Sequence, residues 1–117
     1  MSNESVPDAG DVLWVDFGMP VGREQAGRRP ALVLTPHSYN LRSSVLLVCP
    51  ITRTGRNWPY HVALPPDYVL QGFVVADQIR VIDPAVRVSR PAGRLPEPVF
   101  SEVKGKIAIL FQIPVSS

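Results

Sequence analysis

The chain has few of the residues that build metal sites, disulfides or thiol catalysis. Its 117 residues include one cysteine, Cys49, and two histidines, His37 and His61. One cysteine cannot form an intrachain disulfide, and the apolar stretch 45–49 predicts a buried thiol without a catalytic role. The histidines lie far apart with no cysteine or carboxylate at ligand spacing, so we expect neither a metal nor another cofactor.

Long apolar runs and phosphate-binding glycine loops are also missing. No apolar stretch approaches the length of a membrane span, and the N-terminus lacks the basic and apolar parts of a signal peptide. The sequence contains no Walker loop and no Gly-x-Ser-x-Gly elbow. We therefore expect a cytoplasmic protein that does not act at a membrane.

Lysine is scarce, and the basic residues are almost all arginine. Only two of the 12 basic residues are lysine, and the formal net charge is +2. Arginine makes two-pronged contacts with phosphate and stacks on flat rings, so this bias favours a nucleic acid or an acidic protein as partner.

The apolar pattern predicts a mainly β domain. Thirteen prolines and eight glycines indicate many turns and few helices. Short runs of alternating or branched apolar residues predict strands at 11–17, 31–35, 44–52, 60–64 and 73–82. The spacing of apolar residues from Val99 to Phe111 predicts a helix. We expect a small, strongly bent antiparallel barrel closed by this helix, with a flexible segment 1–9, one domain at 10–113 and a short tail at 114–117.

A polar segment between Gly22 and Pro30 stands immediately before an apolar strand. It holds three arginines and Glu24, and its glycines allow the backbone to approach a ligand. The residue before a proline favours an extended conformation, which would fix Arg29 at the strand edge. The segment is either a basic loop that binds an anion such as a phosphodiester, or an ordinary solvated loop.

A second polar cluster, 52–60, follows the strand predicted at 44–52. Thr52 would sit where that strand ends, and its hydroxyl could satisfy a turn amide or donate to a phosphate oxygen. The cluster mixes charged and flat side chains, as do proteins that hold the backbone of a single strand and stack its bases. The alternative is a solvated hairpin whose two rings face the core.

Four segments together resemble the MazF/PemK (Kid) family of toxins from toxin–antitoxin pairs. They are 10–17, 24–31, 49–52 and 76–80, and the resemblance extends from Gly10 to Phe111. It implies an SH3-like barrel of the MazF/CcdB type that forms a homodimer and cleaves single-stranded RNA (mRNA) at short sequences without a metal. It also implies inhibition of translation and neutralisation by a cognate MazE-like antitoxin with a flexible acidic tail.

Carried over residue by residue, the family pattern implies a catalytic role for Arg29, Thr52 and Glu24. We expect further contacts with RNA from ten residues: Trp14, Phe17, Arg23, Gln25, Arg28, Arg53, Arg56, Trp58, Gln78 and Arg80. Gln78 and Arg80 could instead support the fold. The resemblance gives His61 no role, although a contribution to proton transfer stays open.

Such a site could cut RNA without an enzyme nucleophile, because the adjacent 2′-hydroxyl can attack phosphorus. Arg29 would stabilise the phosphoryl charge, Thr52 would add a donor, and Glu24 could accept the proton. The products would be a 2′,3′-cyclic phosphate and a 5′-hydroxyl. Two alternatives are a CcdB-like toxin that binds a protein such as gyrase, and a non-catalytic RNA-binding barrel. By analogy with the family, the recognised motif would contain A and resemble ACA.

Overall fold

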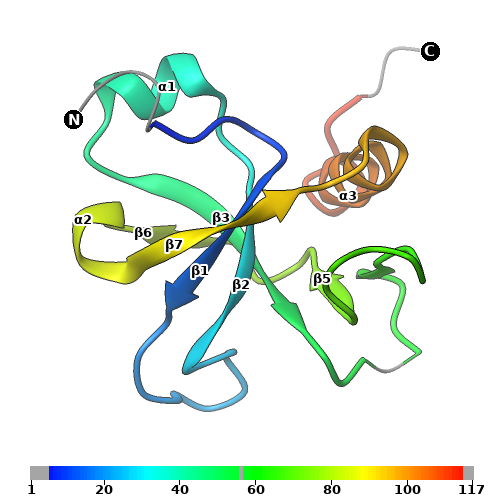
Figure 1. Cartoon of the computed structure of the whole chain (residues 1–117). Helices are drawn as coiled ribbons and strands as arrows, with labels where there is room; N and C mark the ends of the chain where they lie inside the picture. Colours follow the sequence, from blue (N-terminus) through cyan, green and yellow to red (C-terminus); the bar gives the residue numbers. More distant parts are fainter. Residues whose placement is uncertain (1–5, 56, 115–117) are drawn as a thin grey trace.

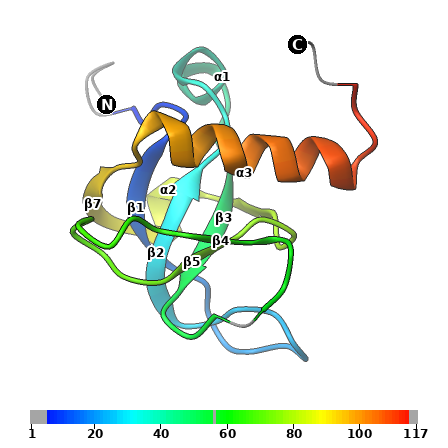
Figure 2. The ribbon, with the colours of Figure 1, turned by 90° about the vertical axis from the view of Figure 1, so that its right-hand side faces the viewer.

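The computed structural model describes residues 6–55 and 57–114, which form a strongly bent antiparallel sheet and three helices. The strand order is β4-β5-β3-β2-β1-β7, and β6 also pairs with β3 (Figures 1 and 2). The strands are β1 (Asp11–Asp16), β2 (Arg28–Val33), β3 (Leu46–Thr52), β4 (His61–Ala63), β5 (Phe73–Val75), β6 (Arg80–Ile82) and β7 (Val88–Arg94). The helices are α1 (His37–Arg42), α2 (Pro84–Arg87) and α3 (Glu97–Leu110). The predicted antiparallel barrel with a C-terminal helix is confirmed.

Both faces of β1 are buried, so the barrel has two apolar clusters. Val12 belongs to one cluster, while Leu13 and Val15 belong to the other. This division follows from the alternation of side chains along a strand. Helix α3 crosses the sheet (Figure 2) and packs Phe100 and Val103 onto the first cluster. Each residue of the central strands therefore faces one cluster or the other. Polar side chains on neighbouring strands can come close together only where they lie on the same face.

The predicted strand 73–82 was wrong in one respect, because it is two strands with an interruption. Val48 pairs with Arg80 and Ile51 pairs with Val74, so three residues along β3 match six along its partner. The extra residues loop out of the ladder, and we call residues 76–79 the bulge. Bulges re-aim side chains and are frequent beside functional sites.

Strand β7 and the two short helices were not predicted from the sequence. β7 contains Pro91 and Gly93, which argue against a central strand, but an edge strand tolerates them because one side of it needs no hydrogen-bond partner. Helix α2 has four residues, and the Asp83 carboxylate caps it by accepting from the Ala85 N–H. The edge position of β7 and the cap of α2 cannot be read from the spacing of apolar residues.

The N-terminal end of the described chain is attached to the loop before α1 and to α1 itself. The Asn40 side chain donates to the Pro7 carbonyl at 3.0 Å, and the Asp8 carboxylate accepts from the His37 N–H at 2.9 Å. The remainder of the predicted flexible N-terminus, residues 1–5, and the last three residues of the predicted tail lie outside the described residues. In the part that is described, no helix has the length and apolarity that a membrane span requires.

Candidate functional site

The two polar loops singled out in the sequence lie at the same end of the barrel, away from α1 (Figures 1 and 2). The first, residues 17–27, joins β1 to β2, and the second, residues 53–60, joins β3 to β4. Two backbone hydrogen bonds close the base of the first loop: Phe17 N–H to Gly27 O at 2.9 Å and Gly27 N–H to Gly18 O at 2.8 Å. Gly27 has a φ of 74°, a conformation that other residues rarely adopt.

Arg29 leaves this loop at the start of β2, directly opposite Val15. Its Nε–H donates to the Ala26 carbonyl at 2.9 Å, which holds the root of the guanidinium. Within the described residues, no carboxylate forms an ion pair with it. A guanidinium has five N–H donors, so most of them are left for an anion. The side chain is therefore fixed at one end and able to bind at the other.

Thr52 ends β3 on the same face of the sheet as Arg29. The β2–β3 ladder pairs Ala31 with Pro50, and because side chains alternate along a strand, Arg29 and Thr52, each two residues beyond that pair, point to the same face as it. Residues directly opposite each other in an antiparallel pair share a face. The Thr52 hydroxyl accepts from the Thr54 N–H at 3.3 Å, the turn contact that the sequence allowed. The same hydroxyl lies 3.4 Å from the Thr54 hydroxyl, and either of the two could donate to the other.

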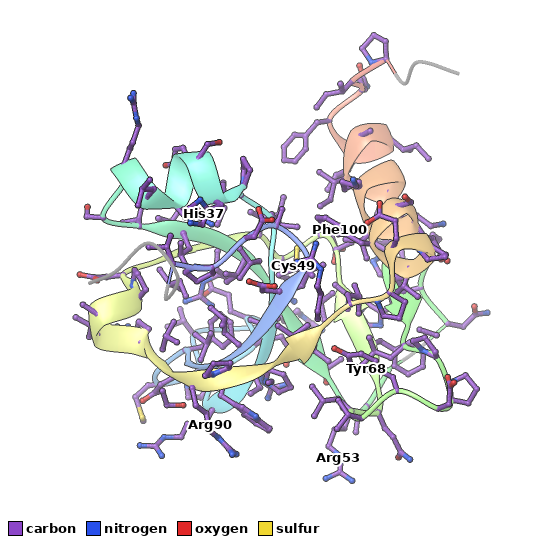
Figure 3. The ribbon with its side chains drawn as sticks, turned by 45° about the horizontal axis from the view of Figure 1, so that its top comes forward. His37, Cys49, Arg53, Tyr68, Arg90 and Phe100 are labelled. Atoms are coloured by element: carbon purple, nitrogen blue, oxygen red, sulfur yellow. The ribbon has the colours of Figure 1, made fainter. Side chains whose placement is uncertain are left out.

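A glycine allows the neighbouring strand to approach the backbone of Thr52 closely. Gly72 has a φ of 129°, and a Cβ at this position would collide with the Thr52 carbonyl oxygen. Thr52 is only 4% exposed, so its carbonyl and side chain are enclosed while its neighbour Arg53 is exposed. Figure 3 shows Arg53 pointing outward, away from the body of the barrel. The end of β3 thus presents one enclosed hydroxyl and one open positive charge.

Glu24 lies at the tip of the first loop, where residues from the bulge and β6 contact it. The Gln25 N–H donates to Gln78 Oε1 at 2.9 Å, and Gln78 Nε2 lies 3.5 Å from the Arg23 carbonyl. Arg80 donates to the Gln25 carbonyl at 3.3 Å and stands 3.8 Å from the Glu24 carboxylate. Gln78 and Arg80 therefore face the loop backbone.

The bulge also holds the second loop. Trp58 Nε1–H donates to the Asp77 carboxylate at 2.8 Å, and the Trp58 and Tyr60 rings lie 5.8 Å apart. Trp58 is 40% exposed, so part of its ring is open to a base. Asp77 and Gln78 are adjacent, so the bulge links both loops. Arg56, which we expected to contact RNA from this loop, lies outside the described residues.

Phe17, one of the expected RNA-binding residues, is buried. It is 6% exposed within the second apolar cluster, and the Arg80 guanidinium lies 5.3 Å from the centre of its ring. Little of the ring is therefore open to a base. By contrast, Arg23 and Arg28 are exposed.

A recess of about 310 Å³ lies on the opposite face of the sheet from Arg29. Its lining includes Trp14 and Pro30, which alternate with Val15 and Arg29, together with Arg53, Tyr68, Val69, Leu70 and Gln71. The structure therefore separates Trp14 from the Arg29–Thr52 face, although the sequence placed both in one RNA site. Arg90 stacks over Trp14 at 5.4 Å. Sequence reasoning missed Arg90 and Tyr68, and only recognition of β7 would have paired Arg90 with Trp14.

Two other side chains of chemically active types are Cys49 and His61. Burial, with a smaller contribution from the charge of Asp77, raises the pKa of the Cys49 thiol to about 12, so it is the inert buried residue that the sequence predicts. The His61 ring lies 6.2 Å from that of Phe73. Across residues 6–55 and 57–114, no three histidine, cysteine or carboxylate side chains are grouped as metal ligands. A larger hollow of about 910 Å³ between α1, α2 and β7 is lined by none of the expected site residues.

Known proteins are similar to this chain in both sequence and fold. Residues 8–111 match the family described as PemK-like, MazF-like toxin of type II toxin-antitoxin system. The endoribonuclease toxin MazF of Escherichia coli (strain K12) is 36% identical over 110 residues, which cover 94% of this chain and 98% of that protein.

Among solved structures, MazF (Form-I) from Deinococcus radiodurans is similar, with a TM-score of 0.85 at 39% identity. The alignment covers 92% of this chain and 97% of that one. The MazE-MazF complex (Form-II) from the same organism gives 0.82 at 38% identity, over 93% and 98% of the two chains.

Proposed function

The chain belongs to the family of PemK-like, MazF-like toxins of type II toxin–antitoxin systems, and we propose from this membership that it cleaves single-stranded RNA with Arg29, Thr52 and Glu24. The observation that carries the proposal is the shared face of Arg29 and Thr52 at the ends of β2 and β3. Glu24 comes from the loop 17–27 at the same end of the barrel. The relatives' activity as endoribonucleases favours this reading over a gyrase-binding toxin and over an RNA-binding barrel without activity.

The reaction needs charge stabilisation more than it needs an enzyme nucleophile. The 2′-oxygen forms a bond to phosphorus, the bond from phosphorus to the 5′-oxygen breaks, and the products are a 2′,3′-cyclic phosphate and a 5′-hydroxyl. Arg29 donates to the phosphoryl oxygens through its unoccupied N–H groups, and Thr52 adds its hydroxyl. A guanidinium keeps its proton near neutral pH, so we assign proton acceptance to the Glu24 carboxylate, with water protonating the leaving 5′-oxygen.

Thr52 sets a condition on this mechanism. Because it is 4% exposed and its hydroxyl contacts Thr54, a phosphate can reach that hydroxyl only if the residues around it, such as the loop 53–60 that follows it, move. That loop begins with the exposed Arg53, whose charge attracts the backbone of RNA. Trp14 and Arg53 line the recess on the other face, and we assign them to nucleotides that flank the cut rather than to the cut itself.

Membership of this toxin family also indicates which proteins the chain would bind. The Deinococcus complex contains MazE with MazF, so we propose a cognate MazE-like antitoxin whose acidic tail competes with RNA for the basic loops. A homodimer is part of the proposal, and exposed apolar side chains at the end of α3, including Ile109 and Phe111, offer area for it. A cytoplasmic location follows from mRNA as the substrate.

Two strands of identical sequence test the proposal. One is all ribose, and the other is 2′-deoxy at the nucleotide before the cut. The proposal predicts cleavage of the first strand only, in excess chelator, with a cyclic phosphate end. Binding of both strands without cleavage would instead support the non-catalytic barrel, and absence of binding would support a protein target.

A further inference from the structure

Gln78 holds both peptide groups on either side of Glu24. Its Oε1 accepts from the N–H of Gln25 at 2.9 Å, and its Nε2 lies 3.5 Å from the carbonyl of Arg23. These two peptide groups define the backbone torsions of Glu24. One carboxamide therefore restrains the direction in which the Glu24 side chain leaves the loop.

Arg80 restrains the same residue from a second side. Its Nη1 donates to the Gln25 carbonyl at 3.3 Å and lies 3.8 Å from Glu24 Oε2. The Glu24 side chain is 56% exposed, so this ion pair is weak and does not lock the carboxylate. Arg80 is itself held by its contact with the Phe17 ring at 5.3 Å. The contacts from Gln78 and Arg80 set the loop backbone while leaving the carboxylate able to turn toward a substrate.

The location of Gln78 explains why it can do this. Gln78 lies in the bulge, between the two segments that pair with β3. In an uninterrupted strand the backbone of Gln78 would instead pair with β3. The loop would otherwise be restrained mainly at its base, through Gly27 and Gly18, and by the turn that joins Glu24 N–H to the Val21 carbonyl. Long loops with polar, exposed tips open easily unless side chains hold them.

We propose that Gln78 and Arg80 are positioning residues that fix Glu24 for catalysis and do not themselves bind RNA. This inference rests on the proposed role of Glu24. It replaces the expectation that Gln78 and Arg80 contact RNA, because their polar atoms are turned to the loop. It predicts that losing the Gln78 contacts lowers kcat and leaves KM nearly unchanged.

Proteolysis after Glu24 measures the restraint without any reference to activity. A glutamate-specific protease cuts there only when the loop opens, while a cut after Glu102 in α3 reports general unfolding. We use Gln78→Met, which keeps the side-chain length and removes its hydrogen bonds. Cutting after Glu24 should rise about tenfold relative to the α3 site, since proteolysis follows the opening equilibrium. Arg42→Ala, which removes an exposed arginine from α1, should leave the ratio unchanged.

A double-mutant cycle tests the link to catalysis. Gln78→Met should lower kcat about tenfold in the native background and less than about twofold in the Glu24→Ala background, because residues that act through one another are not additive. Arg80→Lys should retain more activity than Arg80→Ala, since an ammonium can still donate to the Gln25 carbonyl.

The outcomes separate this inference from the proposed function. An unchanged cutting ratio, or an equal loss of kcat in both backgrounds, would overturn the positioning role. If Glu24→Ala cleaves RNA at full rate, the catalytic assignment of Glu24 fails and the positioning claim fails with it, even where Gln78→Met still opens the loop. Increased cutting together with non-additive kcat supports the inference.

Discussion

Replacing Arg29 with lysine keeps a positive charge at the start of β2 but removes the planar fork of donors. The Nε–H that donates to the Ala26 carbonyl at 2.9 Å is lost as well, so the new side chain is no longer anchored at its root. Lysine is a flexible point charge that does not reproduce two-pronged phosphate binding. The charge would still attract RNA, while the geometry that favours the transition state would be lost.

The expected loss follows from the donors removed. One preorganised donor to a developing oxyanion contributes ~3–4 kcal/mol, or a factor of about 10²–10³ in kcat. Since lysine still supplies one mobile donor, we expect Arg29→Lys to reduce kcat about 10²-fold and Arg29→Ala to reduce it about 10³-fold, with KM changed by less than about threefold. The assay is the initial rate of cleavage of a single-stranded RNA over a range of concentrations.

Arg28 provides the matched control. It is the adjacent arginine, it is exposed, and it pairs with Asp16 across the β1–β2 ladder. Arg28→Lys should keep kcat within about threefold, because no catalytic contact is assigned to it. Full activity of correctly folded Arg29→Lys, or equal losses for the two variants, would refute the forked phosphate contact.

Four further predictions concern neighbouring features of the molecule. Thr52→Val should lower kcat about tenfold or more while Thr52→Ser retains most of it, because only the hydroxyl is assigned a role; cleavage rates decide. Arg53→Ala should raise KM with little change in kcat, since the residue is assigned to flanking nucleotides; a fall in kcat alone would contradict this. Gly72→Ala should lower the free energy of unfolding by ~1–3 kcal/mol, because its φ is 129° and its Cβ would meet the Thr52 carbonyl; denaturant titration measures it. Because burial raises the pKa of Cys49 to about 12, the folded state binds a proton that the unfolded state releases above its ordinary value, so stability should fall as pH rises from about 9 toward 12; the midpoint of denaturation against pH tests the sign.

The apolar pattern of the sequence was sufficient to predict the central strands and α3. The period of two in 11–17 and of about three to four in 99–111 reports burial directly, and burial decides those elements. It could not predict β7, because Pro91 and Gly93 are tolerated only at an edge, and edge position is a property of the whole sheet. The bulge was missed for a related reason, since it arises from a register shift between β3 and two partners.

The candidate site was only partly accessible from the sequence. Arg29 and Thr52 could be named from the resemblance and from their positions at strand ends, and the structure gives them a common face. Phe17 and Trp14 could not be sorted in the same way. One is buried under Arg80, and the other lies on the opposite face of the sheet beside the recess. Which ring is open depends on strand pairing and on cations that come from distant parts of the chain.

The most direct test of the central claim asks whether Arg29 and Thr52 act on one phosphate. The measurement is kcat for single-stranded RNA cleavage by Arg29→Lys, Thr52→Val and the double variant, each shown to be folded. If both side chains stabilise the same phosphoryl group, the double variant should be at most about threefold slower than the slower single variant, because groups that act as a unit are not additive. Two losses that multiply in the double variant, or single variants with undiminished turnover, would contradict the account.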